Sequence, residues 1–168
     1  MQDLNLTPTS YIVLGLLDLV GEATPYGLKQ VVGRSVGHFW TLQHAQLYTE
    51  PARLAKAGYL HEEREEGGRR RKRYSITDKG RAALREWRDT PTDAVAELRD
   101  PGLLKLFFGA DPRELAVVQV EAHRRKLAEY EEIRSTDDGR GPRGPWIALE
   151  SGIGHERQWI SFWEELAE

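Results

Sequence analysis

The chain has 168 residues, of which 39% are hydrophobic and none is cysteine. This length and apolar content are enough for one small folded domain with an extension. The absence of cysteine excludes disulfides, thiol catalysis and cysteine-ligated zinc, and it suits the reducing cytoplasm, where we expect the protein to reside. Residues 1–5 lack the basic and apolar regions of a signal peptide.

The formal net charge of −3 conceals an uneven distribution of charged residues. Residues 1–90 hold 14 Lys and Arg against 11 Asp and Glu, whereas residues 91–168 hold 10 against 16. The positive excess of the first half is small. Binding of a polyanion therefore has to depend on local clustering of its cations and on the doubled surface of a dimer.

Two helices with apolar faces are predicted first. Residues 11–20 form an apolar run that is long enough for a buried helix but too short to span a bilayer, with Thr9 or Ser10 as its N-cap. Thr24 supplies a capping hydroxyl directly before a proline, which predicts a second helix over residues 25–36.

A third helix is predicted from about Leu42, with Thr41 as its N-cap, to Gly58. Its apolar positions fall at helical spacing, which leaves a row of polar side chains for solvent or for a DNA groove. Side chains of these types bind base edges and phosphate oxygens. The candidate contacts on this helix are Gln43, His44, Gln46, Tyr48 and Arg53. Pro51 has no backbone N–H, so it predicts either a bend or a restart of the helix with Thr49 as cap.

Two strands are predicted next, over residues 59–61 and 73–76, with a turn at Gly67 and Gly68 between them. The hairpin carries five consecutive cations, which repel one another unless a polyanion lies beside them. Neighbouring side chains alternate between the faces of a strand, so about half of the run can contact one duplex. The candidate contacts in the hairpin are Arg69, Arg70, Arg71, Lys72 and Arg73.

A helix with exposed polar groups followed by a basic hairpin is typical of a DNA-binding winged helix-turn-helix. A series of short motifs also occurs in fixed order along residues 11–109. They include Leu14-Gly15-Leu16-Leu17, Phe39-Trp40, Gln46-Leu47-Tyr48, Gly68-Arg69-Arg70, Tyr74-Ser75-Ile76-Thr77 and Leu103-Leu104-Lys105-Leu106-Phe107-Phe108. In this order they resemble the PadR family of bacterial transcriptional regulators. The resemblance implies a homodimer that inserts the third helix of each subunit into a major groove of a pseudo-palindromic operator, and a repressor that responds to small aromatic effectors.

Residues 91–168 are predicted to be helical. The apolar run over residues 98–108 predicts a buried connecting helix or turn, and long helices are predicted from Asp111 to about Arg134 and from Pro145 to the end. The last helix carries an apolar stripe that is too broad for one neighbouring helix to cover, which implies a second subunit. The candidate dimerisation or effector residues are Trp146, Leu149, Ile153, Trp159, Ile160 and Trp163.

The sequence therefore predicts a mainly α-helical protein with a small β-hairpin wing. Residues 1–90 are expected to form an N-terminal winged helix-turn-helix, and residues 91–168 a C-terminal helical dimerisation region that responds to an effector. The expected function is a dimeric, sequence-specific DNA-binding transcriptional regulator, a ligand-responsive repressor without a membrane partner. The alternative is a winged helix that contacts another protein instead of DNA, because a fold does not fix its function.

The remaining patterns give no support for an enzyme, a metal site or a cofactor. The five histidines show no metal-ligand spacing, and the sequence has neither a glycine-rich phosphate loop nor a serine elbow. Trp40 and Trp87 are predicted to anchor the core rather than to bind a ligand. The family resemblance places Tyr48 at a phosphate, with packing beneath the helix as the alternative.

Overall fold

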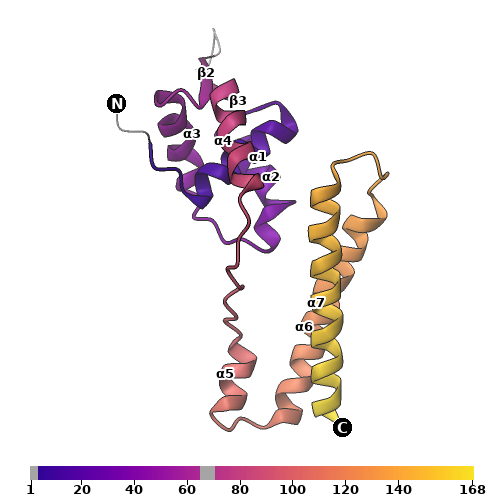
Figure 1. Ribbon diagram of the computed structural model, residues 1–168. Coiled ribbons are helices and arrows are strands. Elements are labelled where there is room, and N and C mark those ends of the chain that lie inside the picture. Colours follow the sequence, from indigo (N-terminus) through magenta and orange to yellow (C-terminus); the bar gives the residue numbers. More distant parts are fainter. Residues whose placement is uncertain (1–3, 65–70) are drawn as a thin grey trace. The chain divides into compact units, whose positions relative to one another are not determined.

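The computed structural model describes residues 4–64 and 71–168 (Figure 1). The chain divides into two compact units, Met1–Ala94 and Val95–Glu168. The first unit holds four α-helices, a short 3-10 helix and a three-stranded sheet within its described residues, and the second holds helices. The predicted fold class, mainly helical with a small sheet, is confirmed.

Helices and strands alternate along the chain of the first unit. Its helices are α1 (Pro8–Val20), α2 (Pro25–Gly33), the 3-10 helix η1 (Val36–His38), α3 (Gln46–Lys56) and α4 (Asp78–Asp89). Its strands are β1 (Glu22–Ala23), β2 (Leu60–Arg64) and β3 (Lys72–Ile76), in the antiparallel order β1-β3-β2. The two predicted strands pair antiparallel and are longer than predicted, and the predicted turn at Gly67 and Gly68 lies outside the described residues. The additional strand β1 has only two residues, too few to be recognised in the sequence.

Side-chain caps set the starts of the first two helices. Thr7, not Thr9 or Ser10, caps α1, because Pro8 occupies the first helical position and Ser10 becomes the third residue of a capping box. Thr24 caps α2 as predicted, with its hydroxyl accepting from the Gly27 N–H at 3.1 Å. The second helix ends earlier than predicted, and the chain continues into η1.

Helix α3 begins later than predicted. Leu42 is outside the helix. The carbonyls of Gln43 and His44 accept from the N–H groups of Gln46 and Leu47, the first two residues of α3. These turn hydrogen bonds replace the side-chain cap expected from Thr41. The helix runs through Pro51 without restarting, and the Thr49 hydroxyl donates back to the Ala45 and Gln46 carbonyls instead of capping. Burial of the Pro51 ring in the core favours this arrangement despite the missing N–H.

The core of the first unit lies around α1, which packs against α3, α4 and β3. Its wholly buried side chains include Val13, Leu14, Leu17, Leu28, Leu47 and Leu54. Gly80, in the first turn of α4, allows this helix to approach the backbone of Tyr59: a Cβ at this position would lie 2.3 Å from the Tyr59 carbonyl oxygen. The apolar sides of α1 and α3 therefore face the same interior, and the polar side of α3 remains at the surface.

The second unit contains α5 (Pro101–Phe107), α6 (Pro112–Ser135) and α7 (Arg143–Ala167). Helices α6 and α7 lie side by side along most of their length (Figure 1). Asp111 caps α6 by accepting from two N–H groups at 2.9 and 3.0 Å, which confirms the predicted start. Within residues 4–64 and 71–168, no helix combines the length and apolar character needed to cross a lipid bilayer.

The prediction that residues 98–108 are buried is wrong for the single chain. Leu104, Phe107 and Phe108 are 59%, 82% and 78% exposed. Helix α5 has only seven residues and turns one side, at Leu103 and Leu106, toward the buried Trp163. The opposite side of the same short helix carries equally large apolar groups that the unit leaves uncovered.

Candidate nucleic-acid interface

The exposed side of α3 carries most of the polar candidates. Gln46 and Tyr48 lie on the helix, and Gln43 and His44 lie in the turn directly before it. All four side chains are exposed, Tyr48 by 49%, so Tyr48 does not pack beneath the helix. The structure thus brings these four residues together at the N-terminal end of α3, where amides, an imidazole and a phenol can contact base edges and phosphates.

Arg53 is hydrogen-bonded within the protein, and its side chain is 36% exposed. Its Nε and Nη2 donate to the two carboxylate oxygens of Glu50 at 2.8 and 2.6 Å, and its Nη2 also donates to the Ser10 hydroxyl at 3.0 Å. Its Nη1 donates to the Asn5 carbonyl at 3.2 Å. Arg53 is therefore placed differently from the other α3 candidates, with its guanidinium turned toward α1 and the segment that precedes it.

Glu50 is the buried acid at the centre of these contacts. Its carboxylate accepts from the Ser10 hydroxyl at 2.6 Å as well as from Arg53, and the residue is only 9% exposed. Burial by itself raises the pKa of Glu50, but the hydrogen bonds from Arg53 and Ser10 together with the positive charge outweigh it and lower the pKa below its ordinary value. The Glu50 side chain therefore points inward, away from the exposed side of α3.

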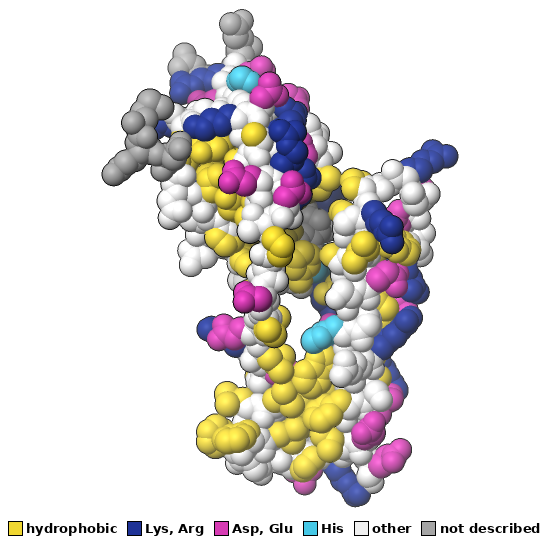
Figure 2. Space-filling model, viewed as in Figure 1, with side chains coloured by type: hydrophobic (Ala, Val, Ile, Leu, Met, Phe, Trp, Pro, Cys, Tyr) yellow, Lys and Arg dark blue, Asp and Glu magenta, His cyan; other side chains and the backbone are white. Residues whose placement is uncertain are grey.

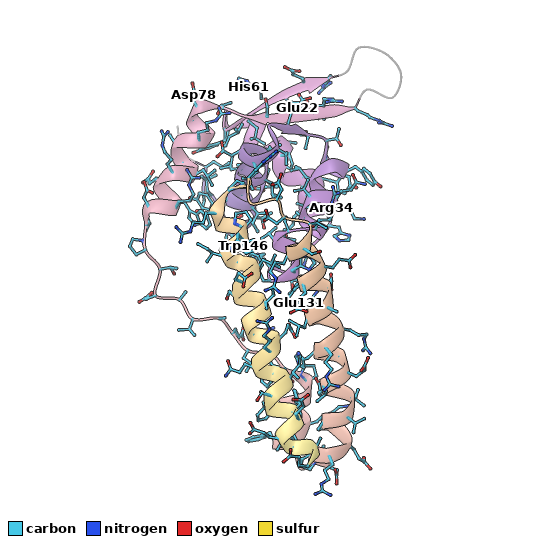
Figure 3. All side chains as sticks on the ribbon, turned by 90° about the vertical axis from the view of Figure 1, so that its right-hand side faces the viewer. Glu22, Arg34, His61, Asp78, Glu131 and Trp146 are labelled. Carbon is cyan, nitrogen blue, oxygen red and sulfur yellow. The ribbon has the colours of Figure 1, made fainter. Side chains whose placement is uncertain are left out.

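The described cations of the hairpin are partly matched by acids. Arg69 and Arg70 lie outside the described residues, and Arg71 is exposed just before β3. Lys72 Nζ donates to Glu62 at 3.2 Å, and Arg73 Nη1 donates to Glu22 at 2.6 Å. Figure 3 shows Glu22 and His61 at the sheet that carries these cations.

Glu62 joins the two long strands on the side of the sheet that faces the core. It accepts from Arg64 at 3.2 Å and from the Tyr74 hydroxyl at 3.1 Å in addition to Lys72. Burial, followed by the hydrogen bond to Glu62, raises the pKa of Tyr74 to about 12. Tyr74 therefore stays a neutral donor to this carboxylate, and the carboxylate in turn holds Lys72 beside the strand.

The tryptophans of the first unit are placed differently from the prediction. Trp40 and Trp87 are 45% and 49% exposed, so neither anchors the core. Trp87 stacks on Tyr11 with a ring separation of 4.8 Å, and Tyr11 in turn packs against the core.

The aromatic stripe of α7 is largely used within its own unit. Ile153 and Trp163 are 1% and 0% exposed, and Trp163 packs with Ala116 and Val120 of α6. Leu149, Trp159 and Ile160 are half-buried, and Trp146 is the most exposed of the six candidates, at 38%. The intramolecular neighbour α6 thus covers more of the stripe than the sequence predicted.

The most exposed apolar groups of the helical part of the second unit lie at the end of α5 and on α6, although Ile147 on α7 is also 53% exposed. Val117 and Val118 on α6 are 68% and 64% exposed, in addition to Phe107 and Phe108. The two valines line a shallow groove of about 660 Å³ between α6 and α7, whose other side chains are Val120, Glu121, Arg124, Arg125, Glu164 and Ala167. Figure 2 shows hydrophobic side chains gathered at the end of this unit that carries α5. The sequence analysis did not identify this surface, for which the two adjacent valines on one long helix are the signal in the sequence.

No group of His, Asp or Glu side chains in the described part of the chain is arranged to hold a metal ion. The closest approach to such a group is a pair, His123 Nδ1 and Glu156 Oε2 at 2.6 Å. His123 also stacks on Trp159, so this pair belongs to the packing between α6 and α7.

Sequence profiles of two families match the two units. The transcriptional regulator PadR-like family matches residues 13–86, and the family described as "Virulence activator alpha C-term" matches residues 98–168. The chain is 23% identical over 171 residues to the negative transcriptional regulator PadR of Bacillus subtilis, which covers 93% of each chain.

Solved structures share the fold. Bacillus subtilis PadR in complex with operator DNA superimposes with a TM-score of 0.82 at 24% identity, covering 94% of this chain and 96% of that one. The same regulator in complex with p-coumaric acid gives a TM-score of 0.75 at 22% identity, covering 97% of both chains. The unit that carries α3 and the sheet, matched over residues 13–86, belongs to the PadR-like family of transcriptional regulators.

Proposed function

We propose that this protein is a dimeric regulator that binds a specific DNA sequence through α3 and the β2–β3 hairpin. The observation that carries the proposal is the exposed group of Gln43, His44, Gln46 and Tyr48 at one end of α3, on a helix whose opposite side is buried. The solved complex of Bacillus subtilis PadR with operator DNA supports this use of the fold. Arg71 adds an exposed cation at the hairpin, and the proposal extends to Arg69 and Arg70 from the sequence.

The salt dependence of duplex binding tests this proposal. If each dimer neutralises several phosphates, raising the salt concentration from 50 to 200 mM weakens binding by roughly 10³-fold or more. The probe is the duplex that the protein enriches from a randomised pool, titrated at equilibrium beside a scrambled duplex of the same composition. Enrichment of no sequence, or a flat salt response, would instead favour the protein-contact alternative.

We also propose that the protein forms a homodimer through the second unit. Phe107, Phe108, Val117 and Val118 are each between 64% and 82% exposed, and the groove beside the valines adds a concave part to this surface. Exposed apolar groups that gather in this way mark interaction sites. A dimer would place two α3 helices on two half-sites of a pseudo-palindromic operator, about one helical turn apart. Of the candidates on α7, Trp159, Ile160 and Trp163 lie toward the end of the helix that is nearest these valines, whereas Trp146 lies near its other end.

Repression and its release by a small aromatic molecule complete the proposal. It is supported by the relative described as a negative regulator and by the structure of that relative with p-coumaric acid. The test uses p-coumaric acid as the probe: we expect it to change tryptophan emission and to release the enriched duplex over the same concentration range. Release of the duplex without an emission change would locate the effector away from the tryptophans. The absence of both effects would rule out p-coumaric acid as an effector.

A further inference from the structure

We infer that Glu50 and Arg53, joined to Ser10, position α3 for specific DNA binding, and that Arg53 acts through this network and not by contact with phosphate. The inference rests on the proposed DNA-binding function. It concerns residues on the inner side of the helix whose outer side carries the candidate base contacts.

The hydrogen bonds of this network meet at the hydroxyl group of Ser10. The buried Ser10 Oγ donates to Glu50 and accepts both from Arg53 Nη2 and from the Thr7 N–H, the last at 2.8 Å. One donor and two acceptor positions of this hydroxyl are thus filled. Arg53 adds two parallel bonds to Glu50 and one to the Asn5 carbonyl, so the first turn of α1 and the segment before it are tied to the middle of α3.

Directional hydrogen bonds of this kind fix the rotation and position of α3, which apolar packing alone does not fix. Leu47 and Leu54 hold α3 against the core, but contacts between aliphatic side chains have no preferred direction and allow a short helix to rotate or slide. A bidentate arginine–carboxylate pair has a fixed geometry. Because Tyr48 and Glu50 lie two residues apart, they point to nearly opposite sides of the helix, and any rotation at Glu50 moves Tyr48 by a similar angle.

Direct binding of phosphate by Arg53 is the competing explanation. The two explanations predict opposite changes in the DNA affinity of the E50Q variant. The E50Q variant removes a negative charge from α3 and loosens Arg53, so a phosphate-binding Arg53 predicts tighter binding to every duplex. Positioning predicts the reverse: weaker binding to the preferred duplex alone. The R53K variant keeps the charge but loses the bidentate geometry, so it retains affinity only if Arg53 is a phosphate ligand.

The experiment measures affinity for the enriched duplex and for its scrambled counterpart, each over a series of salt concentrations, with the full chain. We expect E50Q and R53K each to weaken binding to the enriched duplex by about tenfold or more, the cost of misplacing one base contact. Their binding to the scrambled duplex and their salt slopes should match those of the wild type. The double variant E50Q/R53K should lose no more than either single variant, because the two residues act through one network.

Arg81 provides the matched control. It links α4 to α1 through Asp18 at 3.4 Å and donates to the Ile76 carbonyl at 3.2 Å, in the same unit but away from α3. The R81K variant should keep the wild-type preference for the enriched duplex, and thermal unfolding of all variants shows that each is folded at the assay temperature. Loss of preference in R81K, tighter binding by E50Q, or wild-type affinity in R53K would each overturn the inference. A wild-type protein that enriches no duplex would overturn the proposed function and this inference together.

Discussion

Single residues in the first unit fix how closely its elements approach one another. Gly80 is the clearest case, because its missing side chain leaves room for both the Tyr59 carbonyl and the Ile76 side chain, which would lie 2.3 and 2.8 Å from a Cβ. Most of α4 is exposed, so this contact at its first turn and Leu84 hold much of the helix against the rest of the unit. Even the addition of one methyl group at Gly80 should therefore lower the stability of the first unit.

The variant G80A should therefore destabilise the first unit by about 1 to 3 kcal/mol, since a backbone oxygen cannot move aside for the new methyl group. Urea unfolding measures the loss. The matched variant G33A, also in a helix, places its methyl group where no atom lies within 4 Å, and it should be neutral or slightly stabilising. Equal effects of the two substitutions would show that helix propensity, not the contact with Tyr59, controls the response.

The lowered pKa of Glu50 predicts a loss of stability in acid. A carboxyl group whose pKa is lower in the folded than in the unfolded protein stabilises the fold above the unfolded value, and this stabilisation disappears as the pH falls through the folded value. Stability should thus decline below about pH 4.5, the ordinary value for this group. The variant E50Q should be less stable than the wild type at neutral pH and should decline less steeply in acid, as measured by urea unfolding. Parallel curves for the two proteins would contradict the assignment.

Secondary-structure elements show which contacts the sequence does and does not predict. The caps at Thr24 and Asp111 were predicted correctly because each depends on residues within one turn. The partners of Arg53 were missed because Ser10 lies 43 residues away, and no local pattern reports such a distance. The same limitation explains α5, whose apolar residues predict burial but do not specify which side a neighbouring helix covers. The fold class and the exposed end of α3 followed from periodicity and polarity; the buried network did not.

In the hairpin, the ion pair between Arg73 and Glu22 has a consequence that can be tested. The variant E22Q removes the acid that Arg73 contacts, so Arg73 becomes a stronger ligand for phosphate. We expect tighter binding to the scrambled duplex and a steeper salt dependence, by up to about 0.9 in slope per subunit. The control is E97Q, which removes the same charge from an exposed pair with Arg99 outside the first unit. If both variants change binding equally, net charge and not the Arg73 contact is responsible.

At the scale of the whole molecule, two units of different chemistry share one chain. They are joined by residues 91–100, which have no regular secondary structure. The two units differ in charge, since residues 1–90 hold more Lys and Arg than Asp and Glu and residues 91–168 hold fewer. Both expose large apolar side chains, among them Tyr26 and Phe39 in the first and Phe107 and Phe108 in the second. The proposed DNA contacts lie in the first unit and the proposed dimer contacts in the second, so variants at these two sets of residues test the two proposals separately.

Association is tested by the variant V118D. Val118 is 64% exposed, so the charge is tolerated in a monomer, but it would be buried in the proposed interface. Each lost valine contact contributes about 1.5 to 3 kcal/mol, and the symmetry of a dimer counts it twice, so the variant should be monomeric. Sedimentation equilibrium measures the change. Val95 is 92% exposed and outside the helices, and V95D should remain dimeric; a dimeric V118D would move the interface elsewhere.

The acid partners of the hairpin also bear on how such a protein travels through a genome. A regulator meets far more random sequence than operator, and every cation that binds phosphate lengthens each of these unproductive encounters. With Arg73 held by Glu22 and Lys72 by Glu62, random DNA has to displace an acid before it gains either cation. Each exposed pair contributes at most about 1 kcal/mol, too little to prevent operator binding but enough to shorten the time spent on each random site severalfold. If the hairpin binds phosphate as proposed, the two glutamates favour rapid search over tight retention.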